Sequence, residues 1–153
     1  MDETSKDGHS SLRRYTWSSV GVLAIVQFPF SCGQRVSALT ALNHTGFIAW
    51  TFTTGTFTQL SFHAAFVEKI LPHLQPWPMP NSILILDNAR IHMYAELVAA
   101  VKSHGSIVLF LPLYSPHLNP IEVGFLLIKK WIVKNANLGF HLSPEEALDV
   151  AFS

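Results

Sequence analysis

Asp87 is an acidic residue placed where packing alone does not explain it. It follows Ser82–Leu86, a continuous apolar run typical of a buried strand. Open α/β sheets bind ligands at the carboxyl ends of such strands, so this position favours a functional carboxylate. Burying an unpaired charge is costly, so packing does not account for this carboxylate. The alternative is a cap or turn residue in Asp87–Arg90, paired with Arg90.

Glu122 is the second acid, and it opens a helix predicted over residues 120–137. Asn119 at the N-cap, Pro120 at the first helical position and an acid in the first turn are also the pattern of a capping box. On this local pattern alone, capping explains Glu122 better than catalysis does. The preceding loop adds weight to a functional role, since prolines at 112, 116 and 120 fix where the helix begins.

The elements that must position these acids alternate between strands and helices. Four apolar runs have the length and spacing of strands: Arg35–Leu42, Phe47–Phe52, Ser82–Leu86 and Ser106–Leu111. The first two predict a hairpin, and the last two predict a parallel βαβ unit whose strands are covered on both faces. Helical patterns mark three other segments: Gln59–Leu71, Met93–Lys102 and a helix from Ser143–Pro144 that is expected to be cut short. Residues 1–19 are polar and turn-like.

The composition describes one folded domain over residues 1–153. The chain is 49% hydrophobic and 13% charged, which excludes disorder. Its formal net charge is +0, so it lacks the broad basic field of non-specific DNA binders, and a nucleic-acid role would need a local site. The single cysteine, Cys32, excludes an internal disulfide and a multi-cysteine zinc site. The eight histidines form no HExxH motif, which argues against a zinc hydrolase.

The sequence shows neither a membrane span nor an export signal. Its most apolar early stretch, Val20–Phe30, is 11 residues long and contains Gln27 and Pro29. A membrane span needs about 20 apolar residues. A buried strand is therefore predicted there.

Asp87 and Glu122 lie in two distinctive segments, Leu86–His92 (LDNARIH) and Leu111–Glu122 (LPLYSPHLNPIE). Both segments resemble the DDE superfamily endonuclease domain of mariner-like and related insertion-sequence transposases. Thirty-four residues separate Asp87 from Glu122, the spacing of that family's second and third catalytic acids. The opening residues 2–7 and 14–18 resemble the family's first catalytic segment, which would make Asp2 the first acid. The similarity extends over nearly the whole chain.

The resemblance implies an α/β fold with a ribonuclease-H-like mixed sheet and flanking helices. It also implies a two-metal site in which Asp2, Asp87 and Glu122 hold two Mg²⁺ (or Mn²⁺) ions. The reaction implied is cleavage of DNA phosphodiesters at an element's ends, followed by transfer of the freed 3′-hydroxyl to target DNA. Gly124 departs from an ideal helix, since glycine costs about 1 kcal/mol relative to alanine there.

Four further residues are candidate nucleic-acid contacts. Asn88 and His92 follow the second acid, where they could orient a ligand, touch a phosphate or serve as turn and helix-start residues. Lys129 and Lys130 lie on the basic side of the predicted third-acid helix.

The resemblance also predicts partners and an incomplete domain. The expected partner is DNA, both transposon ends and target, with a homodimer and a nuclear location following from that role. The family's first acid lies on the central strand, but only Met1 precedes Asp2. We therefore expect a domain truncated at its first strand and incomplete at both ends, without the upstream helix-turn-helix region. The alternative is a non-catalytic, domesticated remnant that acts as a nucleic-acid- or protein-interaction domain.

Overall fold

A computed structural model of the chain describes residues 1–6, 17–23, 35–135 and 144–153. Part of the predicted first catalytic segment, Cys32 and Ser143 lie outside these ranges. The strands are β1 (Asp2–Lys6), β2 (Val36–Asn43), β3 (Gly46–Thr54), β4 (Ile83–Leu86) and β5 (Ile107–Phe110). The α-helices are α1 (Gln59–Ala65), α2 (Ala95–Ser103), α3 (Pro120–Lys134) and α5 (Pro144–Phe152). A π-helical turn (Phe66–Ile70) and a 3-10 turn (Leu71–His73) continue α1, and a 3-10 turn (Pro116–Leu118) precedes α3.

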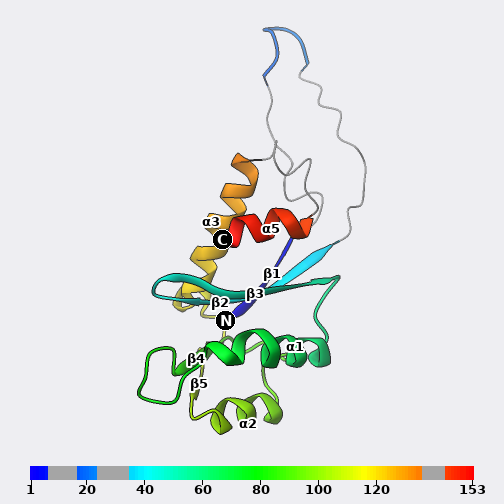
Figure 1. Cartoon of the computed structure of the whole chain (residues 1–153). Helices are drawn as coiled ribbons and strands as arrows, with labels where there is room; N and C mark the ends of the chain where they lie inside the picture. Colours follow the sequence, from blue (N-terminus) through cyan, green and yellow to red (C-terminus); the bar gives the residue numbers. More distant parts are fainter. Residues whose placement is uncertain (7–16, 24–34, 136–143) are drawn as a thin grey trace.

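The described strands form two sheets that meet at the start of β1. One sheet is antiparallel with the order β1-β2-β3, and the other pairs β4 with β5 in parallel. The Met1 amino group donates to the carbonyl oxygen of Ile85 at 3.0 Å, so β1 begins beside β4 (Figure 1). Antiparallel and parallel strands with flanking helices confirm the predicted α/β class.

The structure corrects the predictions for the first part of the chain. Residues 2–6 form a strand rather than a turn, because β2 supplies a partner from Asp2↔Thr40 to Lys6↔Val36. The described part of the predicted buried strand is instead an exposed turn, in which the Val22 N–H donates to the Ser19 carbonyl at 3.0 Å. Residues 24–30 of that prediction lie outside the described ranges.

The predicted hairpin is confirmed as β2 and β3, with a bulge that decides which side chains face α3. The register shifts between Ala41 and Leu42, which leaves Ile48 as an extra residue on β3. Phe47 therefore faces the same side of the sheet as Trp50, and both pack in the core beneath α3 and α5.

The β1-β2-β3 sheet separates two hydrophobic cores (Figure 1). On one side, α1 with the π-helical turn that continues it, α2 and β4 contribute Phe62, Phe66, Leu86, Leu97 and Val101. On the other side, α3 and α5 contribute Ile121, Phe125, Ile128, Ile132, Leu148 and Phe152. Alternation along β2 sends Leu39 into the first core and Ala38 into the second.

The parallel βαβ unit is confirmed, but its strands are not covered on both faces. Leu84 and Leu86 are buried against the α1–α2 side. Ile83, Ile107 and Leu109 on the opposite face are between 43% and 50% exposed. The apolar run was correct as a strand signal, but within the described ranges helices cover one face only. No helix in the described ranges is long and apolar enough to cross a membrane.

Candidate active site

Asp2, Asp87 and Glu122 line one cavity of about 390 Å³. Each acid comes from a different element: Asp2 from β1, Asp87 from the residue after β4, and Glu122 from the first turn of α3. The loop of residues 111–116, which the prolines stiffen, completes the wall. The structure thus brings together the three acids that the sequence separates.

The fold buries the Asp2 carboxylate and holds both of its oxygens. Asp2 is 7% exposed, its Oδ1 accepts from the Glu3 N–H at 2.8 Å, and its Oδ2 accepts from Asn119 Nδ2 at 2.9 Å. Burial raises the pKa of Asp2 to about 6. The Glu3 N–H partly lowers this pKa, and the charge of the nearby Asp87 raises it further.

Asn119 anchors Asp2 and does not cap α3 with its side chain. The residue stands at the N-cap position, but its amide donates to Asp2 and makes no capping hydrogen bond. Its own N–H donates to the Pro116 carbonyl at 2.9 Å, not to Glu122. The capping-box interpretation of Glu122 is therefore wrong. No residue in the described ranges hydrogen-bonds or ion-pairs with the Glu122 side chain, which is exposed at the cavity.

Asp87 presents one carboxylate oxygen to the protein. Its Oδ1 accepts from the Ala89 N–H at 2.9 Å and lies 2.6 Å from His92 Nδ1. The side chain is 44% exposed, and no hydrogen bond from the described residues reaches Oδ2. The predicted alternative of a pair with Arg90 is not formed in the described part of the chain, where Arg90 is exposed.

His92 lies behind the acids, not at the surface. Its ring is 0% exposed, and its Nε2 lies 2.9 Å from Glu3 Oε1. Burial by itself lowers the pKa of His92, but the hydrogen bonds and charges of Glu3 and Asp87 outweigh it, so the pKa is raised. The buried ring offers no exposed atom to a DNA phosphate, and Glu3 is a partner that the sequence did not indicate.

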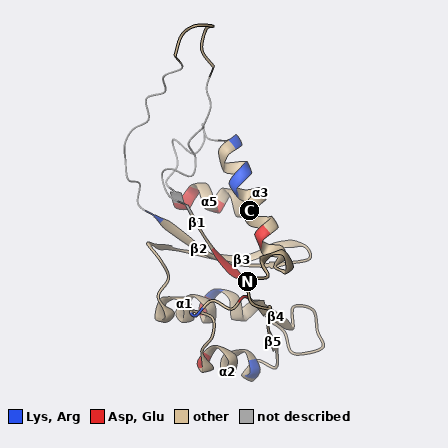
Figure 2. Ribbon diagram, turned by 180° about the vertical axis from the view of Figure 1, so that it is seen from behind, with Lys and Arg blue, Asp and Glu red and all other residues tan. Residues whose placement is uncertain are grey.

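The other predicted nucleic-acid contacts lie in two places. Asn88 lines the cavity, and its amide donates to the Leu111 carbonyl, which joins the ends of β4 and β5. Lys129 and Lys130 are exposed on α3, beyond the cavity lining and farther along the helix than Glu122 (Figure 2).

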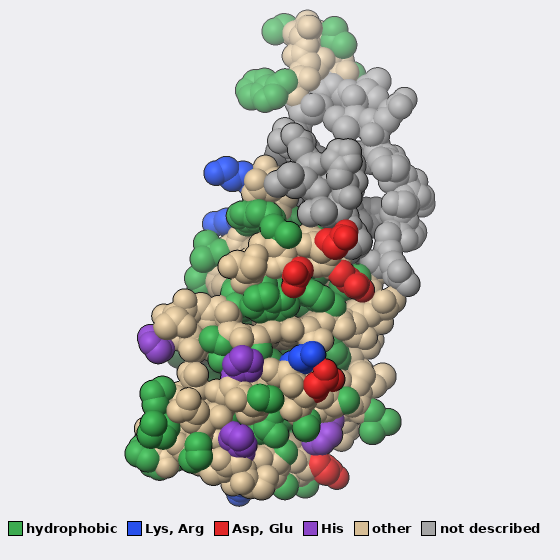
Figure 3. Space-filling view, viewed as in Figure 1, with side chains coloured by type: hydrophobic (Ala, Val, Ile, Leu, Met, Phe, Trp, Pro, Cys, Tyr) green, Lys and Arg blue, Asp and Glu red, His purple; other side chains and the backbone are tan. Residues whose placement is uncertain are grey.

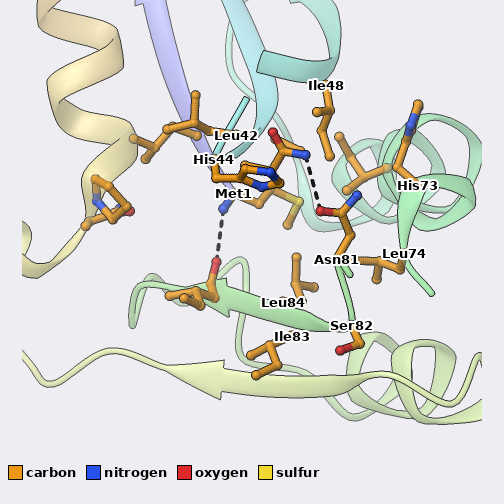
Figure 4. Close-up of a pocket in the computed structure, with 17 residues that line it drawn as sticks. Met1, Leu42, His44, Ile48, His73, Leu74, Asn81, Ser82, Ile83 and Leu84 are labelled. Atoms are coloured by element: carbon orange, nitrogen blue, oxygen red, sulfur yellow. Dashed lines mark hydrogen bonds between the residues drawn. The ribbon is translucent and has the colours of Figure 1, made fainter. Parts of the chain in front are cut away.

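A second cavity, of about 490 Å³, lies between β2, β4 and the start of α3 (Figure 4). Its walls are mostly apolar and carry no carboxylate side chain. The amide of Asn43 donates to the Asn81 side-chain oxygen at 3.2 Å across it. This composition offers a metal ion no acidic ligand, so the acid-lined cavity is the candidate active site.

Comparison with protein families shows where this geometry belongs. A family model described as DDE superfamily endonuclease matches residues 1–141. The chain belongs to the DDE superfamily endonuclease family. The match includes all three acids of this DDE endonuclease domain and ends before α5, and the ribonuclease-H-like fold expected from the resemblance is confirmed. A search of curated proteins found no match.

The donors in this DDE endonuclease domain fit a divalent cation. Mg²⁺ and Mn²⁺ prefer carboxylate oxygens, and three carboxylates from separate elements face one cavity. Ligand atoms of Asp2, Glu3 and His92 also lie within 4.8 Å of one another. However, both ring nitrogens of His92 already face carboxylates, which leaves the oxygens of the acids as the better ligands.

Proposed function

We propose that this chain is the catalytic domain of a mariner-like DDE transposase that cleaves DNA phosphodiester bonds. Asp2, Asp87 and Glu122 would hold two Mg²⁺ or Mn²⁺ ions. One observation carries the proposal: these acids line a single cavity although they come from a strand, a strand end and a helix start. Such convergence of carboxylates is costly unless a cation compensates their charges.

Different residues of the chain would have different roles in the site. When bound, two divalent cations can stabilise the attacking and leaving oxygens of an in-line displacement. Asn119 holds Asp2, while the Ala89 N–H and His92 hold Asp87. Glu122 has no competing partner among the described residues, so it is available as a ligand.

The proposed substrate is DNA, and the proposed reaction has two steps. Water attacks the phosphorus and the 3′-hydroxyl leaves, which nicks the transposon end. The freed 3′-hydroxyl then attacks a phosphodiester of the target, and a target 3′-oxygen leaves. Lys129 and Lys130 would contact DNA phosphates beside the cavity. A DNA substrate would place the protein in the nucleus, and paired transposon ends would favour a homodimer.

Nicking of supercoiled plasmid DNA tests the proposal directly. We expect wild type to produce open circles with Mg²⁺ or Mn²⁺ and none with EDTA. Asp87→Asn should lower the rate by a factor of about 100 or more, as for loss of a major electrostatic group. Glu145→Gln on α5 is the matched control, because this exposed acid does not line the cavity.

Two results would contradict nuclease activity. Equal nicking by wild type and Asp87→Asn would point to a contaminating nuclease. A folded chain that neither binds Mn²⁺ nor nicks DNA would instead support the non-catalytic interaction domain.

A further inference from the structure

His92 joins two acidic residues that come from different strands. Its Nδ1 lies 2.6 Å from Asp87 Oδ1, and its Nε2 lies 2.9 Å from Glu3 Oε1. The ring is 0% exposed and packs against Phe62, whose ring centroid is 5.0 Å away. The imidazole is therefore fixed in position by its contact with Phe62 and by the contacts at both nitrogens.

This arrangement exceeds what packing requires. A buried histidine needs hydrogen-bond partners, but backbone groups can supply them without placing further carboxylates nearby. Here both partners are carboxylates. Glu3 extends from β1 next to Asp2, and Asp87 follows β4, so the ring links the two strand positions that carry the first and second acids.

The bond to Asp87 also determines which of its oxygens is left without a hydrogen bond from the described residues. His92 and the Ala89 N–H both approach Oδ1. Rotation of the carboxylate would break these contacts, so Oδ2 remains the oxygen that is available to a cation. Glu3 in turn restrains the ring that holds Asp87.

We propose that His92 and Glu3 are positioning residues that set the orientation of Asp87 through a carboxylate–imidazole–carboxylate chain. This inference rests on the proposed function, because it assigns the pair a role in metal binding by Asp87. Outer contacts of this kind fix the geometry of metal ligands, and their loss typically weakens metal affinity by a factor of about 10–100.

Two amide substitutions separate the two ends of the ring. In His92→Asn the amide can occupy the position of Nδ1 and keep a donor to Asp87. In His92→Gln the amide reaches the position of Nε2, keeps the contact to Glu3 and loses the contact to Asp87. The probe is Mn²⁺ alone, and its affinity is measured from the electron paramagnetic resonance signal of the free ion.

We expect His92→Gln to bind Mn²⁺ about 10–100 times more weakly than wild type, whereas His92→Asn stays within about tenfold. Equal affinities in both variants, whether unchanged or equally reduced, would overturn the inference, because a role in packing alone does not distinguish the two nitrogens. Thermal unfolding shows whether each variant is folded.

Glu3→Ala keeps the test decisive if the His92 variants do not fold. Its side chain is 22% exposed, so water can replace it. We expect a loss of Mn²⁺ affinity of several-fold, up to about tenfold, and unchanged affinity would overturn the inference.

Asp87→Asn distinguishes failure of the inference about His92 and Glu3 from failure of the proposed function. If neither wild type nor Asp87→Asn binds Mn²⁺, the proposed function fails and the inference fails with it. If wild type binds Mn²⁺, Asp87→Asn does not, and His92→Gln binds normally, the inference alone is overturned.

Discussion

Asp2 is a carboxylate that the fold buries, although a cation would need it in its charged form. Its pKa is about 6 in the folded chain against an ordinary value of 3.8, so the folded state binds this proton more tightly than the unfolded state does. Its contribution to stability is therefore greatest below about pH 4 and falls as the pH rises to about 6. We expect the total loss from this group to be about 3 kcal/mol.

Asp2→Asn should remove that loss. Relative to wild type, the variant should gain stability progressively from pH 4 to pH 7 in EDTA, as measured by urea unfolding. Millimolar Mn²⁺ should restore stability to wild type at pH 7 but not to the variant, because metal binding requires the ionised acid. A wild-type dependence on pH that Asp2→Asn leaves unchanged would contradict the assignment.

Asn119 supports Asp2 from the start of α3, and this contact gives a second prediction. Asn119→Ala removes a hydrogen bond to a buried acid and should lower the free energy of unfolding by about 1.5–3 kcal/mol at pH 7. Asn119→Asp is the informative comparison: aspartate is a good N-cap, but it would place a second carboxylate beside Asp2. It should therefore be the less stable variant at pH 7 in urea unfolding. If Asn119→Asp were as stable as wild type, capping would be the real role of the side chain.

Only some residues of the candidate site could be predicted from the sequence. The place of Asp87 at the cavity could be predicted from a local sign, the end of an apolar strand. For Glu122 the local pattern favoured capping, and only the stiffened helix start and the family resemblance pointed to the cavity. The local pattern of Asp2 indicated only a polar turn, and the family resemblance alone identified it. The contacts of Asn119 and Glu3 could not be predicted, because their partners lie 117 and 89 residues away.

At the scale of elements, α3 positions Glu122 through its close approach to β3. A Cβ on Gly124 would lie 2.8 Å from the Cζ atom of Phe47, whose ring also packs against Phe152 with centroids 4.9 Å apart. This approach explains a glycine that helix propensity disfavours.

Gly124→Ala should therefore destabilise the protein although it improves helix propensity. The propensity gain is about 1 kcal/mol, and overpacking costs about 1–3 kcal/mol, so we expect a net loss of up to about 2 kcal/mol. Displacement of α3 should also slow plasmid nicking. Val123→Ala, at an exposed position on the same helix, is the control for both measurements. A more stable and fully active Gly124→Ala would show that Phe47 can move aside.

The lysines of α3 give a prediction about the path of DNA. Lys129 lies seven residues after Glu122, nearly two helical turns and about 10 Å farther along the same side of α3. On the face shown in Figure 3, acidic side chains gather over α5, which carries Glu145 and Asp149 and no lysine. A DNA path along the lysines of α3 would keep the backbone away from that acidic helix.

Replacing Lys129 and Lys130 together by glutamine should weaken DNA binding without changing Mn²⁺ affinity. Each lost phosphate contact should lower the slope of log affinity against log salt by about 1. Fluorescence anisotropy at several salt concentrations measures this slope. Lys102→Gln on α2 is the control, and an equal effect there would indicate non-specific attraction.

Elements with local patterns could be predicted, and those defined by distant partners could not. The hairpin, the βαβ unit and α3 follow from apolar spacing and turn residues. β1 has little apolar character and exists as a strand because β2 pairs with it. The exposed face of β5 was missed because an apolar run does not reveal how many of its faces other elements cover.

At the scale of the whole molecule, β2 couples the cores on its two faces, so the described domain should unfold as one unit. Phe152→Ala and Leu97→Ala remove buried side chains from opposite cores and should each cost about 2–5 kcal/mol. In both variants, tryptophan fluorescence and circular dichroism should shift together as one transition. If the fluorescence of Trp50 in Leu97→Ala changed only after the circular dichroism signal of the helices was lost, the two cores would unfold independently.

The long sequence separation between contacting residues of the site has a consequence for biosynthesis. Asp2 and Asn119 are 117 residues apart, so the first acid emerges from the ribosome long before its anchor exists. At about 5–20 residues per second, that delay is roughly 6–23 s. During this interval the nascent chain can form the β2–β3 hairpin, but it cannot close the acid-lined cavity. Newly made protein therefore cannot engage DNA through this site until α3 has been translated, which separates synthesis from any nuclease activity.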